Sequence, residues 1–150
     1  MSQSLARNLV HLVFGTKHRA KLLSDAFRPD LHRYMAGILE SVDCPAVIIN
    51  SVPDHVHALF HLHRRRALAS VVGELKRGSS RWLKEADLSL ATFHWQNGYA
   101  AFSVSHSAVP TVKAYISSQA EHHRRKSFED EFRSFLIRHE IPYDERFLWD

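Results

Sequence analysis

Two histidines on either side of one valine form the first candidate site. In the segment PDHVHALFHL, His55 and His57 stand two positions apart. A β-strand here would hold both imidazoles on one face and turn Val56 toward the core, and two neutral imidazoles so placed can bind one metal ion. Two structural histidines would show the same spacing. His61 and His63 continue the parity, but side chains of a straight strand do not converge, so solvent exposure is favoured for them.

A tyrosine and a glutamine four positions apart form the second candidate site. If the segment YISSQ is helical, Tyr115 and Gln119 lie one turn apart and project into the same space. A phenol can act as a nucleophile, but it titrates near 10, so only about one part in a thousand is ionised at pH 7 without help from a metal or a base. A buried tyrosine beside a polar glutamine is the structural alternative.

The elements that must position these residues alternate between strands and helices. Runs of β-branched and aromatic residues predict strands over 8–16, 45–52, 55–63 and 99–105. Apolar residues at helical spacing predict helices over 24–42, capped by Ser24 or Asp25, and over 68–86, 110–123 and 128–139. The turn at Pro53 and Asp54 makes a hairpin. The order predicts one α+β domain over 1–150, with a ferredoxin-like βαββαβ antiparallel sheet and additional C-terminal helices.

Composition limits the classes of protein to consider. The chain has 150 residues, of which 45% are hydrophobic, and a single cysteine, Cys44. One cysteine excludes an internal disulfide and a cysteine-based zinc site, and it favours the cytoplasm. We expect neither a signal peptide nor a membrane span. The sequence contains no phosphate-binding glycine motif, so no nucleotide cofactor is expected.

Positive charge is concentrated away from the C-terminal end. The net charge is +4, yet residues 129–150 hold seven acidic and three basic residues, so residues 1–128 carry an excess of positive charge. His122 and His123 precede three basic residues, and they are either DNA contacts or a solvated helix end. A solvated helix face would also explain the basic run after residue 63, but a nucleic-acid surface fits it too. The candidate phosphate contacts are Lys17, Arg19, Lys76, Arg77, Arg81 and Lys84.

Five motifs in this order closely resemble the single-tyrosine HUH transposases, the small transposases of IS200-like insertion sequences. They are DHVH, KRGSSRWL, WQNGYAAFSVS, YISSQAEHHRRKSF and YDERFLWD, and the resemblance covers nearly the whole chain. It implies that His55 and His57 bind the metal, that Gln119 is the third ligand and that Tyr115 is the catalytic nucleophile. The metal implied is Mg²⁺ or Mn²⁺.

The resemblance also implies an activity. A homodimer in the bacterial cytoplasm would bind hairpin-ended single-stranded DNA at the nucleoid, then cleave and rejoin strands through a 5′-phosphotyrosine intermediate. The alternative is a non-catalytic or domesticated structured DNA- or RNA-binding protein on the same scaffold. The four intact residues His55, His57, Tyr115 and Gln119 argue against that alternative. A small metal hydrolase is a third hypothesis, and it is disfavoured because no carboxylate ligand set is evident in the sequence.

Overall fold

The computed structural model describes residues 2–150. Its strands are β1 (Leu9–Gly15), β2 (Ala46–Val52), β3 (His55–His61) and β4 (Ala100–Val104). Its α-helices are α1 (Arg28–Ser41), α2 (Leu68–Ala86), α3 (Val109–Ser117), α4 (Gln119–His122) and α5 (Phe128–Arg138). Three short 3₁₀ helices join them, η1 (Lys17–Arg19), η2 (Leu88–Leu90) and η3 (His106–Ala108).

The four strands form one antiparallel sheet in the order β2-β3-β1-β4. The two central strands, β1 and β3, pair from Leu9 opposite His61 to Gly15 opposite His55. The outer strands are β4, beside β1, and β2, beside β3. Because α1 connects β1 to β2 and α2 connects β3 to β4, this order confirms the predicted ferredoxin-like sheet.

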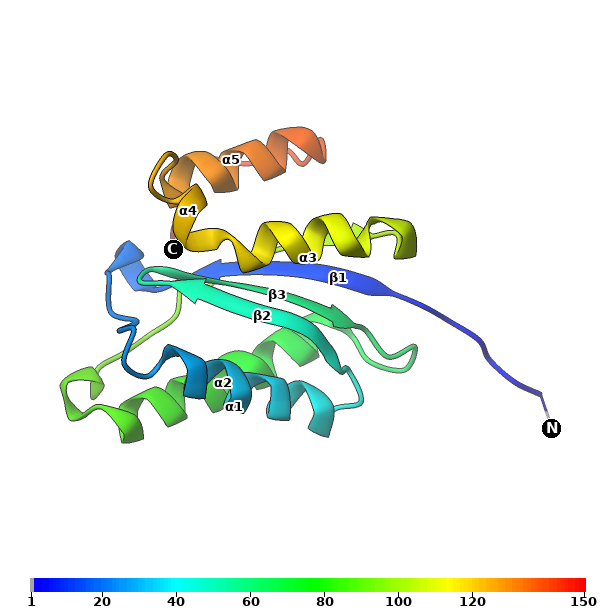
Figure 1. Ribbon diagram of the computed structural model, residues 1–150, viewed down its shortest axis with the longest axis horizontal. Coiled ribbons are helices and arrows are strands. Elements are labelled where there is room, and N and C mark those ends of the chain that lie inside the picture. Colours follow the sequence, from blue (N-terminus) through cyan, green and yellow to red (C-terminus); the bar gives the residue numbers. More distant parts are fainter. Residues whose placement is uncertain (1) are drawn as a thin grey trace.

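Helices cover both faces of the sheet. In Figure 1, α1 and α2 lie against one face, and α3, α4 and α5 lie over the other. The larger core lies between the sheet and the first pair of helices, and it includes Val56, Ala58 and Phe60 of β3. Strand β3 is therefore buried on both sides, so any polar group that it carries toward α3 and α5 is shielded from water.

A second core holds α5 against the sheet. The residues buried there come from β1, β4 and α5, and they are Val13, Ala100, Phe102, Phe128, Phe132, Phe135 and Leu136. The rings of Phe102 and Phe135 stack with their centroids 5.2 Å apart. Phe128, Phe132 and Phe135 follow helical spacing, so one face of α5 is fixed on the sheet. Glu131 lies on this same buried face.

Two predicted boundaries are wrong at the ends of elements. The predicted helix over 24–42 begins only at Arg28, because the Ser24 hydroxyl accepts a hydrogen bond from the Ala26 N–H and closes a turn before the helix. The predicted strand over 55–63 ends at His61, and the chain then turns. The predicted helix over 68–86 agrees with the bounds of α2.

The predicted continuous helix over 110–123 is also wrong, because the structure breaks it between α3 and α4. The Ser118 hydroxyl donates to the carbonyl oxygen of Ala114, 3.0 Å away. The Asn50 side chain of β2 donates to the carbonyl oxygen of Ile116 at 2.8 Å, which occupies an acceptor at the end of α3. This bond between strand and helix fixes the point at which α3 ends.

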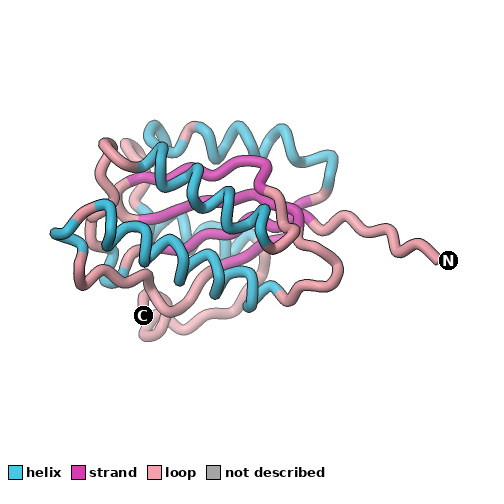
Figure 2. Tube along the Cα trace, turned by 90° about the horizontal axis from the view of Figure 1, so that it is seen from below, coloured by secondary structure: helices cyan, strands magenta, loops and turns pink. Residues whose placement is uncertain are grey.

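The N-terminal segment before β1 projects away from the folded body. Figure 2 shows it extending beyond the helices and strands, as it also does in Figure 1. Among the helices of residues 2–150, none combines the length and the apolar character needed to cross a membrane.

Candidate active site

The two histidines of β3 lie on the sheet face that α3 and α5 cover. His55 pairs with Gly15 of β1 and His57 pairs with Val13, and both rings are fully buried. Val56, between them, belongs to the opposite core. The alternation predicted for this strand is confirmed, and both imidazoles reach the same space.

Each imidazole is held at its Nδ1 atom. Asp54, in the hairpin turn, places Oδ1 2.7 Å from Nδ1 of His55 and accepts its hydrogen bond. Nδ1 of His57 lies 2.8 Å from Nε2 of His11, a buried residue of β1. Partners at Nδ1 orient the rings and leave each Nε2 free to face a common point. Neither Asp54 nor His11 is among the site residues predicted from the sequence.

A carboxylate from α5 occupies the space that the two rings face. Glu131 is almost completely buried, and its Oε1 lies 3.0 Å from Nε2 of His57 and 3.3 Å from Nε2 of His55. Its Oε2 lies 3.3 Å from Nε2 of His123 and accepts a hydrogen bond from the Tyr115 phenol. One acidic side chain therefore contacts the histidine pair, the tyrosine and the segment after α4.

Burial and these contacts shift the pKa values in the site. Burial lowers the pKa of His57 to about 4. Burial also opposes protonation of His55, but the carboxylates of Asp54 and Glu131 outweigh it and raise that pKa. In Glu131 the penalty of burial is outweighed by hydrogen bonding to histidines, so the pKa of the carboxyl is lowered. Burial and then the Glu131 anion raise the pKa of the Tyr115 phenol. The site holds a carboxylate anion beside a neutral phenol.

The donor atoms of this cluster fit a divalent metal ion. One ligand atom from each of His55, His57, His123 and Glu131 lies within 4.8 Å of all the others. Nε2 of His55 is buried and has no hydrogen-bond partner within residues 2–150. An orphaned buried nitrogen of this kind is what a metal ligand leaves when its ion is removed. Imidazole nitrogens with a carboxylate oxygen suit a first-row divalent metal such as Mn²⁺.

A small pocket opens beside the Tyr115 phenol, which is partly exposed. The Lys126 and Arg138 side chains bring positive charge to it, so an anionic phosphodiester can approach the phenol from this side. The pocket has a volume of about 220 Å³, and its lining residues are Tyr115, His122, Lys126, Glu131, Ser134, Phe135 and Arg138.

Gln119 reaches the cluster through a neighbour. It is fully buried at the start of α4, and its Oε1 lies 3.0 Å from Nε2 of His123. Its amide nitrogen donates to the carbonyl oxygen of Tyr115 at 3.3 Å. Because the helix breaks at Ser118, Tyr115 and Gln119 do not lie on one continuous helix as predicted. The role of Gln119 as a metal ligand stays a prediction.

His122 and His123 both face the site. The ring of His122 lies against Tyr115, with centroids 4.5 Å apart, and the ring of His123 lies 4.5 Å from that of His55. The sequence left these two histidines open between DNA contacts and a solvated helix end. The structure places both rings beside the candidate site, His122 against Tyr115 and His123 against His55, and contact with DNA stays a prediction for both.

The predicted phosphate contacts near the first strand lie in η1. The guanidinium of Arg19 forms an ion pair with Glu129 at 2.9 Å and lies over the Trp149 ring, 4.9 Å from its centroid. Lys17 is partly exposed. These contacts tie η1 to α5 and the C-terminal segment, and contact with DNA stays a prediction for both residues.

The other four basic residues lie along α2. A pocket of about 710 Å³ runs beside this helix, and its lining includes Lys76, Arg77, Arg81 and Lys84. The Lys76 ammonium already donates to the carbonyl oxygens of Gln96 and Gly98, each at 2.7 Å, and burial lowers its pKa to about 8. Lys76 therefore holds the loop before β4, and contact with DNA phosphates stays a prediction for all four residues.

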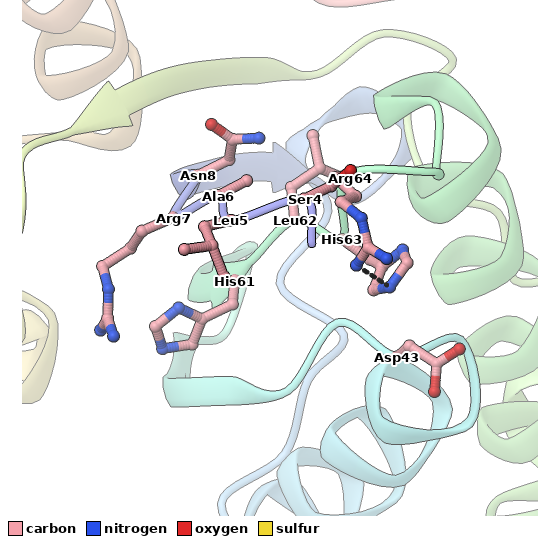
Figure 3. Close-up of a pocket in the computed structure, with 10 residues that line it drawn as sticks. All are labelled: Ser4, Leu5, Ala6, Arg7, Asn8, Asp43, His61, Leu62, His63 and Arg64. Atoms are coloured by element: carbon pink, nitrogen blue, oxygen red, sulfur yellow. Dashed lines mark hydrogen bonds between the residues drawn. The ribbon is translucent and has the colours of Figure 1, made fainter. Parts of the chain in front are cut away.

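His61 and His63 lie outside the cluster of His55, His57, His123 and Glu131, as expected. They line a separate pocket of about 600 Å³ together with the N-terminal segment and Asp43 (Figure 3). Nδ1 of His63 accepts a hydrogen bond from the backbone N–H of Arg65, which turns the chain after β3.

Comparison with known proteins gives one family and two similar folds. The model of the family "Transposase IS200 like" matches residues 4–119. A crystal structure of a candidate transposase from Deinococcus radiodurans R1 is 23% identical, with a TM-score of 0.62, and the match covers 79% of this chain and 98% of that one. A REP-associated tyrosine transposase bound to a REP hairpin is 15% identical, with a TM-score of 0.58, covering 82% and 74%. Among curated proteins, none matches.

Proposed function

The chain belongs to the IS200-like transposase family, and we propose that it is a metal-dependent transposase that cleaves and rejoins single-stranded DNA at hairpin ends. One observation carries the proposal: the His57 ring and the Tyr115 phenol both contact the carboxylate of Glu131. The fold thus brings together the histidine pair and the tyrosine, the groups that the sequence analysis singled out.

His55 and His57 would hold the metal ion, Mg²⁺ or Mn²⁺, with Gln119 as the further ligand that the resemblance implies. A divalent ion there would neutralise the scissile phosphate and polarise its oxygens. Asp54 and His11 support this role, because their bonds to Nδ1 keep each Nε2 directed into the site.

Tyr115 would be the nucleophile. Its phenolic oxygen attacks phosphorus, the bond from phosphorus to the 3′ oxygen breaks, and the products are a 5′-phosphotyrosine and a free 3′-hydroxyl. The ester keeps the energy of the broken bond, so the reverse attack by a 3′-hydroxyl rejoins DNA without ATP. Oε2 of Glu131 already accepts the phenolic hydrogen bond and is placed to take the proton.

Positive charge would guide the DNA. Arg77, Arg81 and Lys84 line the pocket along α2, and we propose that they contact the phosphates of the hairpin. Lys126 and Arg138 would receive the scissile phosphate beside the phenol. A homodimer formed by pairing of sheet edges, at β2 or β4, is part of the same proposal.

The test is a covalent adduct. The full-length protein is mixed with hairpin-bearing single-stranded DNA and Mg²⁺ or Mn²⁺, then denatured and separated on a gel. We expect an adduct with the unmodified chain and none with Tyr115→Phe or without metal. If no adduct forms while His55→Ala keeps full, salt-sensitive DNA binding, the protein is the non-catalytic binder instead.

A further inference from the structure

We propose that Glu131 of α5 is the carboxylate ligand of the metal ion, and that metal binding fastens α5 to the sheet. The inference rests on the proposed function and extends its ligand set, which so far contains His55, His57 and Gln119. Glu131 would also supply a carboxylate metal ligand, which is not evident from the sequence.

The distances support a shared ion. Oε1 of Glu131 lies 3.0 Å from Nε2 of His57 and 3.3 Å from Nε2 of His55. Ligands at about 2.1 Å from one metal ion lie roughly 3.0–3.4 Å apart in octahedral or tetrahedral geometry. Both distances from Oε1 of Glu131 therefore match the separations that ligands of one ion require, and the ligand atoms of the whole group lie within 4.8 Å of one another.

The hydrogen bonding of His55 also favours an ion between His55 and Glu131. Because Asp54 accepts a hydrogen bond from Nδ1, the neutral ring carries a lone pair at Nε2. That lone pair faces an oxygen of the Glu131 carboxylate, and Nε2 has no hydrogen-bond partner within residues 2–150. Two lone pairs at this distance repel each other unless a proton or a metal cation lies between them, and a metal ion can take the position of that proton.

Without a metal ion, the buried carboxylate of Glu131 on α5 depends on the histidines and on Tyr115 to offset its desolvation. Glu131 follows Phe128 by three residues and precedes Phe132, so it lies on the apolar face that packs on the sheet. Burial of a carboxylate among aromatic rings is unfavourable unless it is compensated by charge and hydrogen bonds. A divalent cation held with two neutral histidines provides that compensation, and hard cations prefer an anionic oxygen.

The arrangement joins two parts of the fold. The histidine pair belongs to β3, whereas Glu131 belongs to α5, which residues 123–127 connect to α4. An ion bound to both elements would hold α5 in place and with it the pocket beside Tyr115. Metal binding would then stabilise the fold as well as the chemistry.

The experiment measures Mn²⁺ binding by the full-length protein without DNA. Mn²⁺ is titrated by calorimetry and by its electron paramagnetic resonance signal, and thermal unfolding is followed with and without the ion. The variants are Glu131→Gln, the matched control Glu129→Gln and Phe132→Leu. Glu129 is a half-buried residue of the same helix that pairs with Arg19 outside the cluster. Phe132→Leu loosens the packing of α5 but keeps the carboxylate.

We expect Glu131→Gln to weaken Mn²⁺ binding at least tenfold and to lose the rise in melting temperature that Mn²⁺ causes in the unmodified chain. Glu129→Gln and Phe132→Leu should keep the Mn²⁺ affinity and the Mn²⁺-dependent rise in melting temperature. Equal binding by Glu131→Gln and the unmodified chain would overturn this inference alone. Weakening in Phe132→Leu as large as in Glu131→Gln would also overturn it, since packing would then explain the loss. Absence of Mn²⁺ and Mg²⁺ binding by the unmodified chain, even with hairpin DNA present, would contradict the proposed metal-dependent function itself.

Discussion

Nε2 of His57 lies 3.0 Å from Oε1 of Glu131, although the two residues are 74 positions apart in the chain. The other oxygen of the same carboxylate accepts the hydrogen bond of Tyr115. Residues from β3, α3 and α5 therefore meet at one side chain. Because separate elements supply the proposed metal ligands and the proposed nucleophile, the site depends on how α3 and α5 pack on the sheet.

Replacing Asp54 with asparagine should weaken metal binding without unfolding the protein. The carboxylate that holds Nδ1 of His55 would be lost, and such changes typically reduce metal affinity by about 10- to 100-fold. Adduct formation should then require more Mn²⁺ but recover at high concentration. The Mn²⁺ dependence of adduct yield measures this, with exposed Asp43→Asn as the control. An unchanged dependence would show that Asp54 does not orient the ligand.

Replacing Asn50 with alanine should loosen the tyrosine helix. The Asn50 amide donates to the last carbonyl groups of α3, so its loss should cost about 1 kcal/mol of unfolding free energy and reduce the rate of adduct formation. Chemical denaturation and single-turnover kinetics measure the two effects. Asn50→Asp keeps the size of the side chain but cannot donate, so it should reduce stability and adduct rate at least as much as Asn50→Ala. If Asn50→Asp lowers both quantities less than Asn50→Ala does, the proposed role of this hydrogen bond is contradicted.

Much of the site's framework can be predicted from the sequence, because it depends on local periodicity. The period of two along residues 55–61 predicts which histidines share a face, and the apolar spacing of α2 predicts its bounds. The break at Ser118 could not be predicted in this way, because it involves the Asn50 side chain from a distant strand.

The role of Glu131 could not be predicted either, because its partners come from three other segments. One local signal did exist: an acidic residue stands within the apolar spacing of Phe128, Phe132 and Phe135, where a charge is costly. His11 gives a similar signal, since it lies between apolar residues in the middle of β1. Ionisable residues inside an apolar pattern are therefore the first candidates for a functional site.

Replacing Arg77 and Arg81 with alanine should weaken hairpin DNA binding and reduce its dependence on salt. Each lost phosphate contact should reduce the slope of log affinity against log salt by slightly less than one. Binding measured by fluorescence anisotropy across salt concentrations tests this. Arg146→Ala, whose side chain pairs with Asp144, is the control and should keep the original slope. If all variants show the same slope of log affinity against log salt, Arg77 and Arg81 do not contact the DNA phosphates.

Acid should destabilise the metal-free protein between about pH 6.5 and pH 4. Burial lowers the pKa of His11 to about 3 and that of His57 to about 4, so the unfolded chain binds protons in this range before the folded chain does. Each residue should cost on the order of 3 kcal/mol by pH 4. The raised pKa of His55 acts in the opposite direction.

Unfolding by urea at several pH values measures this effect. His11→Gln removes one of the two groups, so its stability should fall less steeply with acid than that of the unmodified chain. A parallel decline in both proteins would show that His11 is not kept neutral by the fold.

The most direct measurement of the central claim is the identity of the residue that becomes linked to DNA. The full-length protein is reacted with hairpin-bearing single-stranded DNA and Mn²⁺, digested with nuclease and protease, and analysed by tandem mass spectrometry. We expect a nucleotide 5′-phosphate attached to the phenolic oxygen of Tyr115. A nucleotide attached to any other residue, or an adduct that persists in Tyr115→Phe, would contradict this expectation.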